Sequence, residues 1–271
     1  MTPRGKIFVV GFGPGAEQHL TPAARSAMEE CDTCIGYRTY IDLVRPLLAG
    51  KKIVATGMTE EIDRGRKAYE LAKLGKKVAV ISSGDSGVYG MAGLVYEVLE
   101  KAGWDPAAPD VDVIIVPGVT AACSIGALLG APLNHDFCSI SLSTLMTPWE
   151  AIEKRLEAAA SSDFVTALYN PKSARRDWQI VKTQEIFLKY HKPSTPVGLV
   201  KSGWREGEII VRTTLDKMAE QEIGMLTTII IGNSQTYYFK DLMITPRGYT
   251  NKYNLETKGG DLERLKEKEV V

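Results

Sequence analysis

"VVGFGPGAEQHLTPAAR", residues 9–25, joins an apolar strand to a helix through a loop that contains three glycines. The loop lacks the Gly-Lys-Ser/Thr sequence of a P-loop, and Ala16 stands where a dinucleotide-binding fingerprint has its third glycine. The helix begins several residues later, at Thr21 and Pro22, where a capping side chain precedes a proline in the first turn. The loop therefore permits close approach to its backbone, but it is not built to place a phosphate on a helix dipole.

The segments around this loop alternate between short apolar strands and amphipathic helices. The predicted strands are residues 6–11, 33–37, 52–56, 77–83 and 111–118, and the predicted helices are residues 21–30, 39–50, 61–75 and 90–103. This alternation predicts a mostly parallel sheet that is covered on both faces. Ligands of such sheets bind beyond the carboxyl ends of the strands. We therefore expect the glycine-bearing loops 11–17, 82–90 and 117–122 to line one crevice.

The second half of the chain has more strands for each helix. The predicted strands are residues 139–145, 163–170, 195–203, 208–215 and 227–234, and the predicted helices are residues 120–130, 148–162 and 174–190. This ratio favours a mixed sheet and a second α/β domain. We predict an α/β fold with an N-terminal domain over 1–118, a C-terminal domain over 119–249 and a polar extension over 250–271.

The composition argues against several classes of partner. The chain carries 33 Lys and Arg against 33 Asp and Glu, so no long-range field attracts nucleic acid or an anionic membrane. The longest apolar runs, VDVIIVPGV and TTIIIG, have the length of strands and are far too short for a bilayer. The start of the sequence has no apolar stretch that would form a signal peptide. We expect a soluble, cytoplasmic protein.

The cysteines and histidines give little support to a metal centre. Cys31 and Cys34 form a C-x-x-C pair, which can be a redox or zinc motif. A structural role is favoured, because Cys31 closes a predicted helix, Cys34 lies in an apolar strand, and no second C-x-x-C completes a zinc site. Cys123 and Cys138 are predicted to be small core residues. We expect no protein-bound metal.

Three stretches carry polar side chains next to strand ends. In SSGDSGVYG, Asp85 lies between two glycines, where its carboxylate can face a ligand or cap the next helix. In YNPKSARR, Asn170 precedes three basic residues, which suit either a ligand site or a helix start with solvated charges. In VKSGWREGE, Lys201 can face a ligand, and Gly203 can be a simple turn.

Together these stretches resemble the tetrapyrrole methyltransferases that use S-adenosylmethionine. The sequences VGFGPGAEQHLT, SSGDSGVYG, PGVTAA, LYNPKS and VKSG occur in the order and spacing of that family. Longer stretches, IGYRTYIDLV, LLGAPLNHDFCSISLSTLMTPWEAIEKR and LMITPRGYT, are similar to the branch that methylates C-17 of precorrin-3B or cobalt-factor III at ring contraction. The resemblance covers residues 5–250. It implies S-adenosylmethionine as cofactor, S-adenosylhomocysteine as product, a tetrapyrrole substrate, a homodimer, and an active site in the cleft between two α/β domains.

The resemblance also implies cofactor contacts at matching positions. They are Pro14, Ser83, Gly84, Asp85, Val88, Thr120, Ala121, Asn170 and Gly203. One position departs from the family, because many relatives have an acidic residue directly after GPG, where this chain has Ala16 followed by Glu17.

Candidate catalytic and substrate-binding residues follow from the same motifs. The macrocycle carbon is itself the nucleophile, so no activated serine or cysteine is required. Ring contraction needs a titratable group at the macrocycle, and the candidates are Asp85, Tyr89, His135 and Asp136. A neutral protein has to bind a polycarboxylate through local cations, and the candidates are Arg38, Lys172, Arg175, Arg176 and Lys201.

Several alternatives stay open on the sequence. Within the same fold, the chain can methylate another carbon of a cobalamin-pathway tetrapyrrole. A protein- or RNA-modifying methyltransferase is a different class, and the neutral charge and lack of a basic, aromatic-rich stretch argue against it. A non-catalytic cofactor-binding module is a third interpretation. The sequence also leaves open whether the macrocycle carries cobalt or is metal-free.

Overall fold

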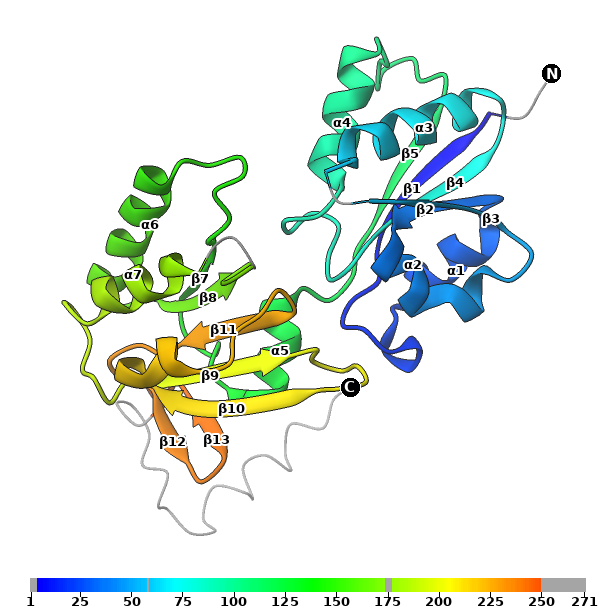
Figure 1. Ribbon diagram of the computed structural model, residues 1–271. Helices are drawn as coiled ribbons and strands as arrows, with labels where there is room; N and C mark the ends of the chain where they lie inside the picture. Colours follow the sequence, from blue (N-terminus) through cyan, green and yellow to red (C-terminus); the bar gives the residue numbers. More distant parts are fainter. Residues whose placement is uncertain (1–3, 58, 174–176, 250–271) are drawn as a thin grey trace, which may run out of the picture.

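The computed structural model describes residues 4–57, 59–173 and 177–249, which form two α/β lobes (Figure 1). The first lobe contains a five-stranded sheet in the order β3-β2-β4-β1-β5, in which every pair of neighbours is parallel. Its strands are β1 (Lys6–Gly11), β2 (Thr33–Tyr37), β3 (Lys52–Thr56), β4 (Lys77–Ser82) and β5 (Asp112–Val116). The prediction of a parallel sheet in this half of the chain is confirmed.

Helices cover both faces of the first sheet. They are α1 (Pro22–Glu30), α2 (Arg38–Val44), α3 (Glu61–Lys73) and α4 (Ala92–Lys101), with short 3₁₀ helices at Glu17–His19 and Arg45–Leu48. Successive side chains of β1 point to opposite faces, so Phe8 and Val10 pack with α1 and α2, while Ile7 and Val9 pack with α3 and α4.

The ends of two helices follow from local sequence. The Thr21 side chain accepts a hydrogen bond from the Ala24 amide at 3.1 Å and caps α1, as the sequence predicts. The helix predicted over 39–50 is shorter, because α2 ends at Val44 and a 3₁₀ helix follows. Pro46 has no backbone N–H to continue the α-helical hydrogen bonds.

The second lobe contains a mixed sheet in the order β10-β9-β11-β8-β7, in which β7 and β8 are parallel and the other neighbours are antiparallel. Its strands are β7 (Phe137–Ser141), β8 (Val165–Tyr169), β9 (Pro196–Lys201), β10 (Ile209–Thr214) and β11 (Thr227–Ile231). Its helices are α5 (Ala121–Leu129), α6 (Trp149–Ser161), α7 (Trp178–Phe187) and a 3₁₀ helix at Leu215–Glu220. The prediction of a mixed sheet is confirmed.

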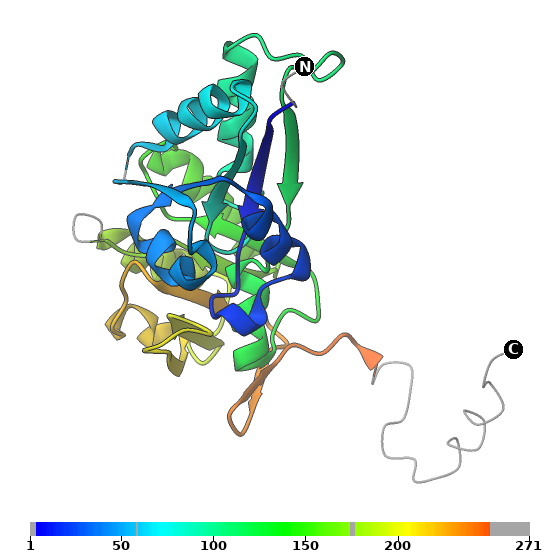
Figure 2. The same ribbon diagram turned by 90° about the vertical axis from the view of Figure 1, so that its right-hand side faces the viewer.

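A small three-stranded sheet was not predicted from the sequence. It pairs β12 (Tyr237–Phe239) with β13 (Leu242–Ile244), and β13 with the two-residue strand β6 (Gly130–Ala131). The tip of the β12–β13 hairpin projects from the second lobe (Figure 2), whereas Tyr238 and Met243 pack on the core of that lobe. Strands this short show no clear alternation of apolar and polar residues, so the sequence gives little signal for them.

The cysteines differ from the prediction at one position. Cys31 and Cys34 are buried, and burial raises the pKa of both thiols. Cys138 is partly buried against the core of the second lobe. Cys123 is exposed, so its prediction as a core residue is wrong. Helix α5 buries Ala122 and Ile125 and turns the face that carries Cys123 to the solvent.

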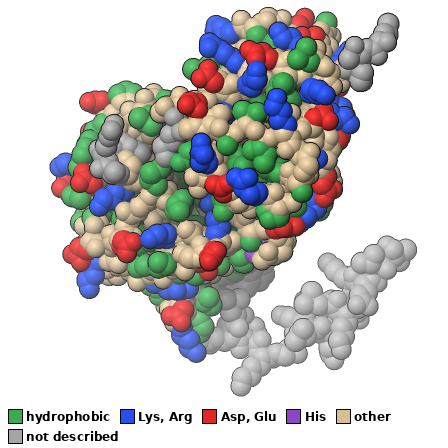
Figure 3. Space-filling model, turned by 45° about the vertical axis from the view of Figure 1, so that its right-hand side comes forward, with side chains coloured by type: hydrophobic (Ala, Val, Ile, Leu, Met, Phe, Trp, Pro, Cys, Tyr) green, Lys and Arg blue, Asp and Glu red, His purple; other side chains and the backbone are tan. Residues whose placement is uncertain are grey.

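Residues 117–120 connect the last strand of the first sheet to α5, which packs on the second sheet. A domain boundary after residue 118 remains a prediction. On the face shown in Figure 3, acidic and basic side chains are interspersed without a large patch of one sign. Among the described residues, no helix has the length and apolar character needed to cross a bilayer.

Candidate functional site

Three loops of the first lobe pack backbone against backbone where β1, β4 and β5 end. The Gly13 amide donates to the Gly84 carbonyl oxygen at 2.8 Å, and the Val119 amide donates to the Gly13 carbonyl oxygen at 3.3 Å. A Cβ atom on Gly13 would overlap the Val119 carbonyl oxygen, and one on Gly118 would overlap the Gly84 carbonyl oxygen. The glycines are therefore required because the loops lie too close together for any side chain.

Asp85 holds two of these loops together. One of its carboxylate oxygens accepts a hydrogen bond from the Gly87 amide at 2.8 Å, and the other accepts one from the Gly118 amide at 3.0 Å. Both oxygens are thus engaged within the protein, on the loop after β4 and the loop after β5. The geometry gives Asp85 an organising role in the site.

The second lobe faces these loops with the ends of β7, β8 and β9. Tyr169, at the end of β8, shares its hydroxyl with the Thr120 hydroxyl at 2.6 Å and with the Ala122 amide at 2.8 Å. Burial raises the pKa of Tyr169, which keeps this hydroxyl neutral. Asn170 has a φ of 51° and donates from its side chain to the Ser141 hydroxyl at 3.0 Å.

A cavity of about 120 Å³ lies between the lobes. The first lobe and the connection contribute Pro14, Tyr40, Ser83, Gly84 and Val119. The second lobe contributes Ala121, Ser124, Ile125, Val200, Ser202, Gly203, Arg205, Met225, Leu226 and Thr228. Its wall combines apolar side chains with backbone and hydroxyl groups, and Arg205 is the one charged residue that lines it among those described.

A larger cleft of about 730 Å³ lies next to this cavity, and the two share Tyr40 and Ser83. The cleft is lined by polar and charged groups of the first lobe, by Ser139, Ser141 and Ser143, and by the loop before α6. Two apolar side chains of that loop, Leu145 and Met146, are 74% and 88% exposed. Two adjoining cavities suit two ligands that have to meet at a common boundary.

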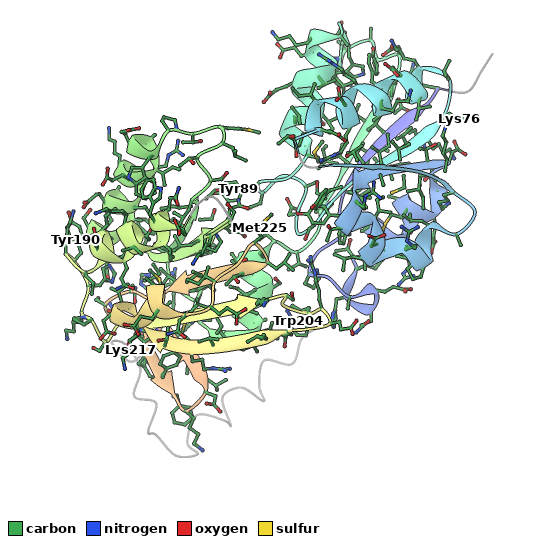
Figure 4. The ribbon with its side chains drawn as sticks, viewed as in Figure 1. Lys76, Tyr89, Tyr190, Trp204, Lys217 and Met225 are labelled. Carbon is green, nitrogen blue, oxygen red and sulfur yellow. The ribbon has the colours of Figure 1, made fainter. Side chains whose placement is uncertain are left out.

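Tyr89 bridges the two lobes beside the larger cleft. Its hydroxyl donates to the Ser139 carbonyl oxygen at 3.0 Å, and its ring lies 4.9 Å from the ring of Tyr169. Figure 4 shows Tyr89, Met225 and Trp204 where the lobes face each other, whereas Lys76, Tyr190 and Lys217 lie at the periphery.

The structure gathers the predicted cofactor contacts around this junction. Pro14, Ser83, Gly84, Ala121 and Gly203 line the smaller cavity. Asn170 lines the larger cleft. Asp85, Val88 and Thr120 lie within or beside the same loops, without lining either cavity. Glu17, which follows the departing position Ala16, pairs with Arg25 at 3.1 Å.

Two predicted catalytic residues lie away from the cavities. His135 and Asp136 precede the first residue of β7, whereas Ser139 and Ser141, which line the larger cleft, lie at its middle and at its carboxyl end. Asp136 is exposed, and its carboxylate lies 3.9 Å from Arg247. The structure brings Asp85 and Tyr89 to the junction of the lobes but does not bring His135 and Asp136 there.

The predicted substrate cations are also scattered. Lys201 pairs with Glu222 at 3.0 Å, and neither Lys201, Arg38 nor Lys172 lines a cavity. Arg175 and Arg176 lie outside the described residues. The cations that do line the cavities are Arg64, Arg155 and Arg205.

Sequence reasoning missed Tyr40 and Arg205, although both lie in stretches that it singled out. Tyr40 belongs to IGYRTYIDLV and lines both cavities. Arg205 belongs to VKSGWREGE, where only Lys201 and Gly203 were considered. Burial raises the pKa of Tyr40 and lowers that of Arg205. Within the described ranges, no group of three or more His, Cys, Asp or Glu side chains is placed to hold a metal ion.

Known proteins resemble this chain in both sequence and fold. Residues 6–219 match the family described as Tetrapyrrole (Corrin/Porphyrin) Methylases. The chain is 57% identical over 252 residues to the cobalt-factor III methyltransferase of Priestia megaterium, covering 93% of this chain and 46% of that protein. It thus spans about half the length of that relative.

Two further proteins match along nearly their whole length. The chain is 46% identical over 244 residues to the probable cobalt-factor III C(17)-methyltransferase of Salmonella typhimurium, covering 90% of this chain and 99% of that protein. It superposes on the crystal structure of the methyltransferase CobJ with a TM-score of 0.83 and 35% identity, covering 89% of this chain and 100% of that one. Sequence and fold agree that this chain belongs to the tetrapyrrole methylase family.

Proposed function

We propose that this protein transfers a methyl group from S-adenosylmethionine to C-17 of a cobalt-factor III-type macrocycle, coupled to ring contraction. The observation that carries the proposal is the pair of adjoining cavities, which share Tyr40 and Ser83 at the junction of the lobes. Two relatives, at 57% and 46% identity, are named for activity on cobalt-factor III. Their names favour the cobalt-containing substrate over precorrin-3B.

The smaller cavity has the character that the methyl donor requires. Its apolar wall includes Ile125, Val200 and Leu226. At Gly84 and Gly203 the wall exposes backbone groups that a ligand can contact, without phosphate-binding features. At about 120 Å³ it can enclose only part of a nucleoside–amino acid donor, because typical ligand sites measure roughly 300–1,000 Å³. The rest of the donor has to lie at the junction with the larger cleft.

The protein's own residues bind and orient the two reactants and keep water out of the site. S-adenosylmethionine supplies, when bound, a methyl group on a positively charged sulfur. A carboxylate against that sulfur would stabilise the ground state more than the transition state. Both oxygens of Asp85 are turned to the Gly87 and Gly118 amides, which is consistent with a role in holding the loops. Loops held in fixed positions can align the donor with the macrocycle, and alignment of two reactants can lower the activation barrier by ~7–11 kcal/mol.

The larger cleft suits a flat macrocycle that carries carboxylates. Leu145 and Met146 offer exposed apolar surface for the ring, and Arg155 offers a charge. Arg155 forms no ion pair with another described residue, so its guanidinium is available for a carboxylate.

Anaerobic incubation with cobalt-factor III and S-adenosylmethionine carrying a ¹³C methyl group tests the proposal. NMR should place the label on C-17, and mass spectrometry should show one added methyl group. Label on another carbon would support a different cobalamin-pathway methyltransferase of the same fold. Binding of S-adenosylhomocysteine without turnover of any tetrapyrrole would support a binding module and contradict an enzyme.

The family resemblance further implies a homodimer in the cytoplasm. Sedimentation equilibrium measures the mass in solution, and a monomer at all concentrations would contradict the dimer.

A further inference from the structure

Arg205 is a cation without a counter-ion, among the described residues, inside the smaller cavity. It lies in the turn between β9 and β10, and its Nη2 donates to the Ser83 hydroxyl of the first lobe at 2.6 Å. Its Nε is buried and has no hydrogen-bond partner in the described ranges. No carboxylate in the described part of the chain lies within ion-pair distance of its guanidinium.

The surrounding structure holds Arg205 in this place. Ser202 and Trp204 have φ values of 53° and 61°, a conformation that costs free energy and persists only where neighbours enforce it. The Trp204 indole donates to the Ser124 carbonyl oxygen at 2.8 Å, and its ring packs edge-on against His19 at 4.7 Å. The turn is thus fixed to both lobes.

Gly15 leaves the space that the arginine needs. A Cβ atom at Gly15 would lie 2.6 Å from Cγ and 2.7 Å from Nε of Arg205. The glycine loop of the first lobe therefore makes room for a side chain of the second lobe as well as for its own neighbours. This close fit orients the guanidinium along the cavity wall, where Tyr40 and Ser83 also lie.

Arg205 is partly buried, and burial of a guanidinium without a counter-ion is unfavourable because no opposite charge offsets the lost hydration. Tyr40 is the other titratable group that lines this cavity among the described residues, and burial raises its pKa and keeps it neutral. A ligand that brings a carboxylate would satisfy both the charge and the free Nε donor.

We infer that Arg205 is a carboxylate-binding residue of the smaller cavity. This inference rests on the proposed function, which supplies two sources of a carboxylate: the amino-acid part of the methyl donor and the periphery of the macrocycle. The cavity wall favours the donor, since Arg205 lines the smaller cavity and not the larger cleft.

Calorimetry with two matched ligands separates this role from a structural one. S-adenosylhomocysteine carries the carboxylate, and S-adenosyl-3-thiopropylamine is the same molecule without it. In Arg205→Gln, affinity for S-adenosylhomocysteine should fall about 10- to 100-fold, the range of a charge-assisted hydrogen bond, while affinity for the decarboxylated ligand stays unchanged. Arg205→Lys should recover part of the loss. Arg45→Gln, which removes an exposed cation paired with Asp42, is the control.

The remaining outcomes each decide the question. If both nucleoside ligands bind Arg205→Gln normally but the Kd for the macrocycle rises, Arg205 binds a carboxylate of the macrocycle, and the inference holds with the second source. Equal losses for both nucleoside ligands, or no loss for any ligand, would leave Arg205 as a structural contact only and overturn the inference. If wild-type protein binds no S-adenosylhomocysteine, the proposed function itself fails.

Discussion

The two arginines of the larger cleft have different surroundings, which give them different roles. Arg64 is 5% exposed and donates to the Thr56 hydroxyl, the Gly57 carbonyl oxygen and the Glu61 carboxylate. Its donors are therefore committed to the protein, and it braces the start of α3. Arg155 is exposed on α6 and has no such partners among the described residues. Of the two, Arg155 keeps its donors available for a ligand.

Replacing Arg155 by Gln should raise the KM for the macrocycle about 2- to 5-fold, the range of an exposed ion pair, and leave kcat nearly unchanged. The wild-type KM should rise with salt, and the variant's KM should rise less, because exposed charges are screened. Steady-state kinetics at low and high salt measure both effects. Arg66→Gln removes an exposed arginine of α3 outside this cleft and serves as the control. Equal salt dependence in wild type and Arg155→Gln would contradict the prediction.

The structure brings together the glycine-bearing loops that the sequence predicted to meet, but not the predicted substrate cations, for a physical reason. Ser83, Gly84 and Gly203 lie just after the ends of strands, and the strand ends of an α/β sheet meet at one edge. Arg155 lies inside a predicted helix, and its usefulness depends on which face of α6 turns toward the other lobe. Local sequence contains no information on that packing. It also does not reveal ion pairs between distant residues, so Lys201 was predicted to bind substrate although it pairs with Glu222.

At the scale of elements, the first sheet is stabilised by the close packing of its three glycine loops. Strands β4, β1 and β5 are neighbours in the sheet, so the loops that follow them leave from adjacent positions. The alternation of strands and helices predicted all three of these strands, because each of them is a continuous apolar run. It could not predict the β12–β13 hairpin, whose strands have three residues each.

Gly118→Ala should destabilise the protein by about 3 kcal/mol or more, at or above the upper end of the usual range for single substitutions, because the new Cβ would overlap the Gly84 carbonyl oxygen. Gly93→Ala is the matched control. Gly93 lies in α4, where an added Cβ atom would meet open space, so alanine should stabilise the protein by about 0.5–1 kcal/mol. Urea unfolding measures both changes, and similar midpoints for the two variants would contradict the close packing of the loops.

A second element-level prediction concerns Glu30, which ends α1. Its carboxylate accepts hydrogen bonds from Lys77 and Lys6, each at 3.1 Å, and these contacts lower its pKa below 4.5. A lowered pKa in the folded state means that the stabilisation is present above about pH 4.5 and is lost as the pH falls through the folded-state pKa. Glu30→Gln should therefore be less stable than wild type near neutral pH, and the difference should shrink in acid. Thermal unfolding as a function of pH tests this, and a constant difference would contradict it.

At the scale of the whole molecule, the site exists only where the lobes meet. Pro14, Ser83 and Gly84 come from the first lobe, whereas Gly203 and Leu226 come from the second. The two lobes are connected through residues 117–120 and bridged by Tyr89 and Arg205. A ligand in the smaller cavity contacts both lobes at once, so its binding free energy should oppose any local opening that separates them.

Hydrogen exchange should show this coupling directly. With S-adenosylhomocysteine at about 100 times its Kd, exchange through openings that destroy the site should slow by up to about 100-fold. Peptides covering residues 82–90 in the first lobe and 199–208 in the second should be protected together. The tip of the β12–β13 hairpin, residues 239–242, is exposed and lines neither cavity, so it should be unaffected. Protection confined to one lobe would mean that the ligand binds within that lobe, because a ligand held between the lobes cannot stabilise one wall of the cavity without the other.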